Sequence, residues 1–175
     1  SNNSLRRRLK EWISLRHLLS RNNMNVIDEF WSRFVNTNPQ YKDKKYIEAF
    51  YFSLTEKSAN HLLKLVLDGK KTATCSSLLG YQIENEKIPM PKDLSIVTDF
   101  KGIPFCVIET KVITILPFNQ MTYDICRREG EDECLETWVE NHEHFFTEES
   151  KMVGYKFTNN MLVVFEDFEV IYKEN

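Results

Sequence analysis

The stretch from Leu67 to Ser76 reads LDGKKTATCS and marks the passage from a helix to a strand. Apolar residues recur at helical spacing just before it. Gly69 stands where a left-handed glycine commonly ends a helix. The threonine-rich residues that follow favour an extended conformation. This segment therefore predicts a helix, a glycine and a strand, with Lys71 and Thr74 near the beginning of the strand.

The segments on either side of this stretch alternate irregularly between helices and strands. We expect extended segments over residues 46–54, 94–100, 104–117 and 161–172, and helices over 24–36, from Thr122 to Glu129 and over 135–146. Helices inserted at irregular intervals argue against a doubly wound parallel sheet. The pattern predicts an α+β fold with a small, mixed and strongly curved β-barrel, whose helices pack around a cleft.

The composition is that of one folded domain with a short appendage. The chain has 175 residues, 42% of them hydrophobic, which is enough to bury a core without metals or disulfides. None of the four cysteines forms a CxxC pair, so we expect reduced thiols and a cytoplasmic protein. No apolar run is long enough to span a membrane, and no secretory signal is recognisable.

The chain divides into three parts. Residues 1–23 form a basic extension with six basic residues and one acid. We interpret it as non-native or tag-derived; a basic arm for a membrane surface or RNA, or a helix that packs on the body, are the alternatives. Residues 24–45 are a leading helix and a link, and residues 46–175 are the barrel domain.

The charge distribution limits the choice of partners. Outside residues 1–23 the chain holds 17 basic and 25 acidic residues, and its overall net charge is −3. An acidic body argues against tight binding to a nucleic-acid backbone, so no DNA partner is expected. A local basic groove stays compatible with this distribution.

Two familiar site patterns are absent. The run from Gly69 to Thr72 looks like a phosphate loop, but Lys64 stands where that motif needs its first glycine and Lys71 where it needs serine or threonine. Cys126, Cys134, His142 and His144 match no usual zinc spacing. We therefore expect no nucleotide triphosphatase, no metal and no cofactor.

Three segments taken together resemble the ASCH domain, a member of the PUA-like β-barrel superfamily. They are Leu67–Ser76, Pro104–Thr110 with its continuation to Phe118, and Glu129–Asp132 followed by Trp138, His142 and Phe145-Phe146. The likeness spans residues 46–172 and implies a bacterial cytosolic member with a β-barrel. It implies a role in RNA binding or RNA processing, with a ribonuclease among the possible hydrolases.

One subgroup of this family removes the acetyl group from 4-acetylcytidine with a lysine, a threonine and a glutamate. Its Gly-x-Lys-Thr-x-Thr pattern is matched by Lys71 and Thr74, and its glutamate by Glu129, so these three are the implied catalytic residues. This chain is longer than members of that subgroup. The substrate-binding residues expected around them are Lys70, Thr72, Ser76, Arg128, Trp138 and His142.

Amide hydrolysis requires a nucleophile, a proton carrier and a group that stabilises the oxyanion. Glu129 is a candidate base toward water or Thr74. Lys71 can stabilise the oxyanion or, with a lowered pKa, act as the base, and Thr74 can be the nucleophile or a hydrogen-bond donor. In a regular strand positions 71 and 74 point to opposite faces, so the three residues converge only if the chain bends.

Two other classes of function remain open. A non-catalytic module could hold RNA or a nucleotide, with Tyr81, Phe118 or Trp138 stacking on a base. Its basic rim would come from Lys70, Lys71, Arg127 and Arg128. Alternatively, residues 129–149 could form the acidic face of a protein-interaction domain. The sequence does not define the oligomeric state.

Overall fold

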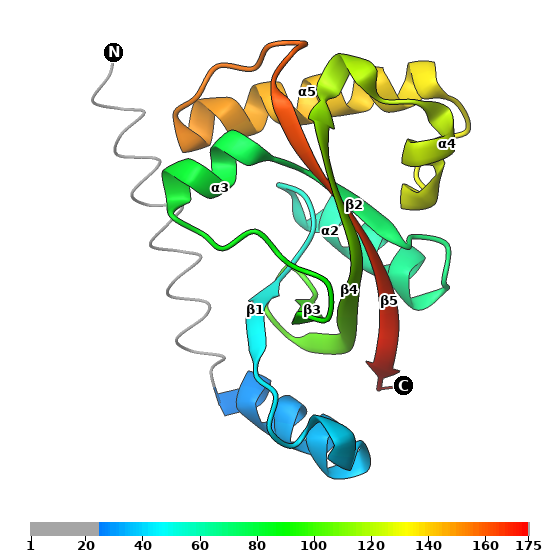
Figure 1. Cartoon of the computed structure of the whole chain (residues 1–175). Coiled ribbons are helices and arrows are strands. Elements are labelled where there is room, and N and C mark those ends of the chain that lie inside the picture. The colour runs from blue at the N-terminus through cyan, green and yellow to red at the C-terminus, as the bar shows by residue number, and fades with distance from the viewer. Residues whose placement is uncertain (1–24, 175) are drawn as a thin grey trace.

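The computed structural model describes residues 25–174, and their strands form one mixed five-stranded sheet (Figure 1). The strands lie in the order β1 (Tyr46–Phe50), β3 (Leu94–Thr98), β4 (Pro104–Pro117), β5 (Leu162–Lys173) and β2 (Ala73–Ser77). The β1–β3 pair is parallel and the other three pairs are antiparallel. The mixed α+β class that the sequence predicts is thus confirmed.

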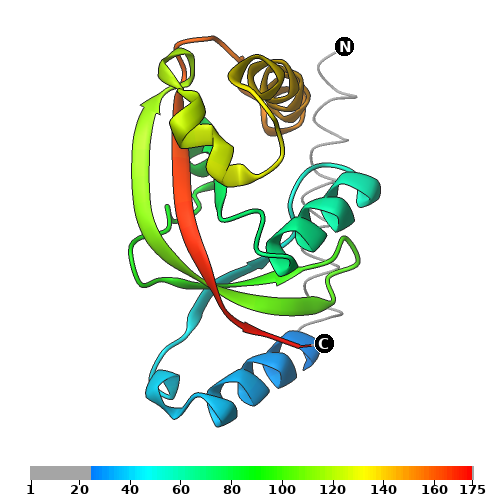
Figure 2. The ribbon, with the colours of Figure 1, turned by 90° about the vertical axis from the view of Figure 1, so that its right-hand side faces the viewer.

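The long antiparallel pair of β4 and β5 forms the centre of the sheet. Its register runs from Cys106 opposite Lys173 to Pro117 opposite Leu162, with irregularities at two places in β4. Such bulges increase the local twist, and Figure 2 shows both strands as long curved ribbons side by side. The strand predicted over residues 104–117 is confirmed with these bounds.

The sheet of the described residues is open, so the predicted small, strongly curved barrel is not confirmed. β1 and β2 have five residues each and stand at opposite edges of the strand order. The edge at β2 is covered by a 3-10 turn, η3 (Arg127–Glu129). The backbone N–H of Thr72 donates to the Arg128 carbonyl, and that of Cys75 donates to the Glu129 carboxylate. Edge strands are often protected by such a cover.

Helices pack at both ends and on the sides of the sheet (Figures 1 and 2). They are a helix over residues 25–37, α2 (Glu56–Leu67), α3 (Leu78–Glu84), α4 (Tyr123–Cys126) and α5 (Leu135–Val153), with 3-10 turns η1 (Pro39–Tyr41) and η2 (Phe118–Gln120). The predicted helices are present, but α5 extends well beyond the predicted end. The sequence analysis did not predict α3.

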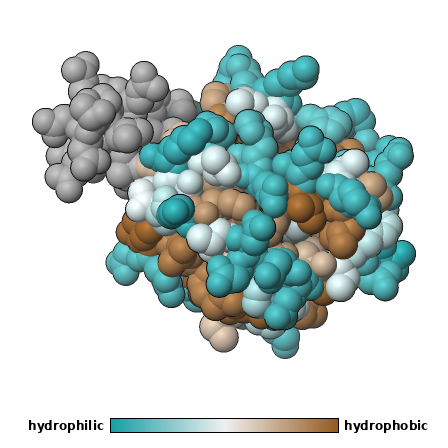
Figure 3. All heavy atoms as spheres, turned by 90° about the horizontal axis from the view of Figure 1, so that it is seen from above, coloured by the Kyte–Doolittle hydropathy of each residue, from teal (hydrophilic) through white to brown (hydrophobic). Residues whose placement is uncertain are grey.

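Three apolar cores hold these elements on the sheet. The first lies around Trp138 and Phe146 of α5, the second around Leu63 and Val66 of α2, and the third around Phe30 of the helix over 25–37. Seen from above, the α5 end carries hydrophilic side chains interspersed with apolar ones (Figure 3). The interpretations of residues 1–23 lie outside the described residues.

None of the helices within residues 25–174 combines the length and apolarity needed to cross a bilayer.

Candidate functional site

Lys71 is a buried cation between two carboxylates. The chain leaves α2 through Gly69, which has a φ of +72°, and Lys71 then points inward with only 1% of its surface exposed. Its Nζ lies 3.3 Å from Glu129 Oε1, forms an ion pair with Glu131 and lies 5.1 Å from the centre of the Phe52 ring. Sequence analysis did not select Glu131 as a site residue, although it lies within the acidic face proposed over residues 129–149.

The Glu129 carboxylate is held by four donors. Its Oε1 accepts hydrogen bonds from Lys71 Nζ and from the Cys75 backbone N–H at 2.9 Å. Its Oε2 accepts one from Trp138 Nε1 at 2.6 Å, and His142 Nε2 lies 3.2 Å away. Because both oxygens are occupied from two sides, Glu129 joins β2 to η3 and α5.

Gly130 permits this close junction. It adopts a φ of +68°, and a Cβ at this position would lie 2.2 Å from the carbonyl oxygen of Lys70. The backbone of η3 can therefore approach the exit of α2 only because residue 130 has no side chain.

Lys71, Glu129, Glu131 and His142 form a largely buried cluster whose opposite charges compensate one another. Burial by itself raises the pKa of Glu129, but Lys71, His142 and the Trp138 hydrogen bond outweigh it and hold that pKa well below its usual range. Burial lowers the pKa of Lys71 and of His142, yet Glu129 and Glu131 more than compensate and leave both raised. An ionised, fully hydrogen-bonded carboxylate is a weak base, and a charged lysine cannot accept a proton.

Thr74 lies on the other face of β2. Burial alternates along this strand: Cys75 is buried and packs into the first core with Trp138, whereas Thr74 and Ser76 are only partly buried. All four residues from Thr74 to Ser77 contribute to the lining of a pocket of about 150 Å³. In the described chain, the Thr74 hydroxyl forms no hydrogen bond with the side chain of Lys71 or of Glu129. Phe52 connects the two places, because it lines the pocket and also contacts Lys71.

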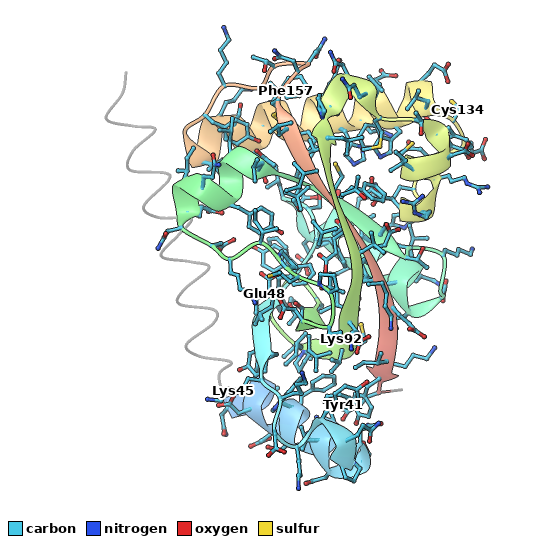
Figure 4. All side chains as sticks on the ribbon, in the orientation of Figure 1. Tyr41, Lys45, Glu48, Lys92, Cys134 and Phe157 are labelled. Carbon is cyan, nitrogen blue, oxygen red and sulfur yellow. The ribbon has the colours of Figure 1, made fainter. Side chains whose placement is uncertain are left out.

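The pocket is aromatic and acidic. Its aromatic lining comes from Phe50, Tyr51, Phe52, Tyr81 and Phe145. Its acidic lining comes from Glu48, Glu84, Glu86, Glu149 and Glu166. Figure 4 shows Glu48 on β1. No lysine, arginine or histidine is among the lining residues of the described chain.

Glu166 is the most deeply buried of the acidic pocket residues, none of which the sequence analysis selected as a site residue. Only 4% of it is exposed, and its Oε1 accepts a hydrogen bond of 2.6 Å from Thr110 Oγ1. Burial raises its pKa; the Thr110 bond offsets part of the rise, and Asp93 and Asp167 add to it. An acid that directly follows the apolar run Val163-Val164-Phe165 within a strand was the available signal.

The predicted substrate-binding residues are scattered. Ser76 lines the pocket, whereas Trp138 and His142 are buried against Glu129. Arg128 forms two hydrogen bonds with Asp167 and one with a backbone carbonyl. Lys70 is exposed, and both the hydroxyl and the N–H of Thr72 donate to the Arg128 carbonyl. Apart from Ser76, none of the six lines the pocket.

The site has no evident place for a metal. Within residues 25–174, no group of three or more histidine, cysteine or carboxylate side chains is arranged to hold an ion.

Comparison with known proteins establishes the family. The model of the ASCH domain matches residues 48–172. The crystal structure of an ASCH domain from Lactobacillus crispatus JV V101 is 31% identical, with a TM-score of 0.77, and the match covers 85% of this chain and 95% of that one. A crystal structure from Enterococcus faecalis V583 is 30% identical, with a TM-score of 0.75, over 85% and 89% of the two chains. No curated protein matches. This chain belongs to the ASCH domain family.

Proposed function

We propose that this protein binds a nucleoside in the pocket beside Thr74 and hydrolyses an acyl amide on its base, with 4-acetylcytidine as the first substrate to test. The observation that carries the proposal is the pocket itself. It presents a threonine hydroxyl among aromatic and acidic side chains, without a basic residue among its described lining.

This lining favours a neutral nucleoside over an RNA strand. Aromatic side chains can stack on a base, and glutamates can accept hydrogen bonds from its amino or imino groups. The same glutamates repel phosphates, whereas RNA binding and ribonuclease action need cations along the backbone. Two of the cations expected for a basic rim are already engaged, Lys71 by Glu129 and Glu131 and Arg128 by Asp167.

In this proposal Thr74 contacts the substrate, and Glu129 and Lys71 hold Thr74 in position. The N–H that Glu129 accepts belongs to the peptide bond between Thr74 and Cys75. Lys71 keeps Glu129 ionised and so keeps this bond strong. Loss of Glu129 or Lys71 is therefore expected to impair activity through the backbone at Thr74.

Hydrolysis of 4-acetylcytidine by the purified protein, followed by absorbance, tests the proposal. Thr74→Val should lower kcat/KM by at least about 10²-fold, because it removes a reacting hydroxyl while keeping the shape. Thr114→Val, on β4 and outside the pocket lining, is the matched control and should be neutral.

If no hydrolysis is seen at high enzyme concentration, 4-acetylcytidine is excluded as the substrate. An RNA affinity that falls steeply with salt would then favour the binding module instead.

A further inference from the structure

Thr74 and Glu166 are paired directly across two antiparallel strands. Thr74 of β2 stands opposite Glu166 of β5 in the register. Directly opposite residues of an antiparallel pair point to the same face, with Cβ atoms about 4.5–5.5 Å apart. Both residues line the pocket. A hydroxyl and a carboxylate are thus placed side by side, facing the space that a ligand would occupy.

The carboxylate has one oxygen available. Thr110 donates to Oε1, whereas Oε2 accepts no hydrogen bond in the described chain. Only 4% of the surface of Glu166 is exposed. The Thr74 hydroxyl likewise has no hydrogen-bond partner among the described residues. Oε2 is not among the fully buried polar atoms that lack a partner, so it stays accessible from the pocket that Glu166 lines, where a ligand or the neighbouring hydroxyl can reach it.

We propose that Glu166 is the general base that activates Thr74 for attack on the acyl group. This inference rests on the proposed function and assigns to Glu166 the role that the sequence analysis gave to Glu129. Glu129 is unsuited to the role because Lys71, Cys75, Trp138 and His142 occupy its oxygens. The raised pKa of Glu166 makes it the stronger base of the two.

The first half of the reaction transfers the acyl group to the enzyme. Thr74 Oγ1 attacks the acyl carbonyl carbon, and its proton passes to Glu166 Oε2. The phenol of Tyr81, which burial keeps protonated by raising its pKa, donates to the carbonyl oxygen as it becomes an oxyanion. The bond between that carbon and the base nitrogen then breaks. Glu166 returns the proton to the leaving nitrogen, which gives the free amino group and an acyl ester on Thr74.

The second half releases the acid. Water attacks the ester carbon and gives a proton to Glu166. The ester bond breaks, and Glu166 returns this proton to Thr74 Oγ1. The products are the carboxylic acid and the regenerated hydroxyl, so protons balance and no oxidant or cofactor enters.

Two substrates separate this inference from the proposed function. The first is p-nitrophenyl acetate, an activated ester that reports acetylation of Thr74 without any nucleoside, read by intact mass and peptide mapping. The second is 4-acetylcytidine. The variants are Glu166→Gln, which keeps an acceptor for Thr110, and Glu169→Gln on the same strand, whose side chain is 62% exposed and pairs with Lys111.

We expect Glu166→Gln to slow acetylation of Thr74 by about 10²–10⁴-fold, because a general base contributes this much. Glu169→Gln should match the wild type, and cytidine affinity, measured by calorimetry, should be the same in all three proteins. If Glu166→Gln does not fold, Glu166→Asp should still slow the reaction by withdrawing the carboxylate.

The two substrates give results that distinguish the role of Glu166 from the identity of the substrate. Acetylation of Thr74 that depends on Glu166, without turnover of 4-acetylcytidine, would support the dyad and reject the substrate. Wild-type protein in which Thr74 is not acetylated, or an unchanged rate in Glu166→Gln, would overturn the inference. A weaker cytidine affinity with an unchanged rate would also overturn it, because Glu166 would then be a recognition residue.

Discussion

The ammonium of Lys71 and the carboxylate of Glu129 meet at 3.3 Å inside the protein, although 58 positions separate them along the chain. Both side chains are almost completely removed from solvent, at 1% and 2% exposure. A charge buried in this way is costly unless a partner of opposite charge compensates it. The pair therefore holds together the exit of α2, the edge of β2 and the turn η3, and its loss affects the fold before it affects any chemistry.

Lys71→Met should lower the free energy of unfolding by about 3–5 kcal/mol, because it leaves Glu129 buried without its cation. Urea denaturation measures this directly. Lys64→Met is the matched control, since Lys64 pairs with Asp68 on an exposed helix face and should cost less than about 1 kcal/mol. Adding Glu129→Gln to Lys71→Met should recover part of the loss. Equal and small effects of the two lysine variants would contradict the structural role of Lys71.

The protonated imidazole of His142 should make stability depend on pH. Its pKa is raised above the ordinary value of 6.5, so its contribution is complete below that pH and is lost as the pH rises through the folded-state pKa. The groups that face it are Glu129, Glu131 and the Trp138 carbonyl.

Unfolding free energies from about pH 6 to about pH 9 measure this dependence. His142→Gln should flatten the decline in this range, whereas His144→Gln, which is exposed on the same helix, should leave it intact. A decline of the same size in His142→Gln would assign it to other groups.

Gly130→Ala should be much more harmful than Gly69→Ala. Both glycines have a positive φ, which costs alanine about 1–2 kcal/mol. At Gly69 a Cβ meets nothing within 4 Å, whereas at Gly130 it would overlap the Lys70 carbonyl at 2.2 Å. The overlap should add about 1–3 kcal/mol, measured as the difference between the two variants in urea. Similar losses in both would show that the η3 turn yields easily.

Local patterns predicted most of the fold. The strand from Pro104 to Pro117 was predictable because β-branched residues recur along most of its length. Helix α3 was not, because it has seven residues, begins directly after β2 and depends on the Ser77 hydroxyl, which accepts from the Gly80 N–H. Closure of the sheet depends on which strands meet at its edges, and no local pattern encodes this.

The candidate site was predictable only in part. Lys71 and Glu129 were selected together, and they do meet. Thr74 was selected with them but faces the pocket, since the alternation of the strand was not overcome by a bend. Trp138 and His142, which were expected to bind a substrate, lie buried against Glu129. Glu166 was assigned only to a strand, because its position opposite Thr74 depends on the pairing of β2 with β5, which the sequence does not reveal.

Phe34→Ala should destabilise the protein by about 3–5 kcal/mol, the usual loss for a buried phenylalanine. Phe34 is completely buried, and its ring packs on Trp31, Tyr41 and Tyr172. Thermal or urea unfolding checks this value. Val26→Ala on the same helix, at a position 36% exposed, should change stability by no more than about 0.5 kcal/mol. A loss below about 1 kcal/mol for Phe34→Ala would show that this helix adds little to the core.

The third core shows that the folded unit begins earlier in the chain than the match to the family. The recognisable family motif begins at residue 48, but Phe30 and Phe34 of the preceding helix cover Leu94, Ile96 and Val107 of the sheet. A chain shortened to the motif would retain every matched position and present an apolar wall to water. The smallest cooperative unit of this protein is therefore larger than the segment by which its ancestry is recognised.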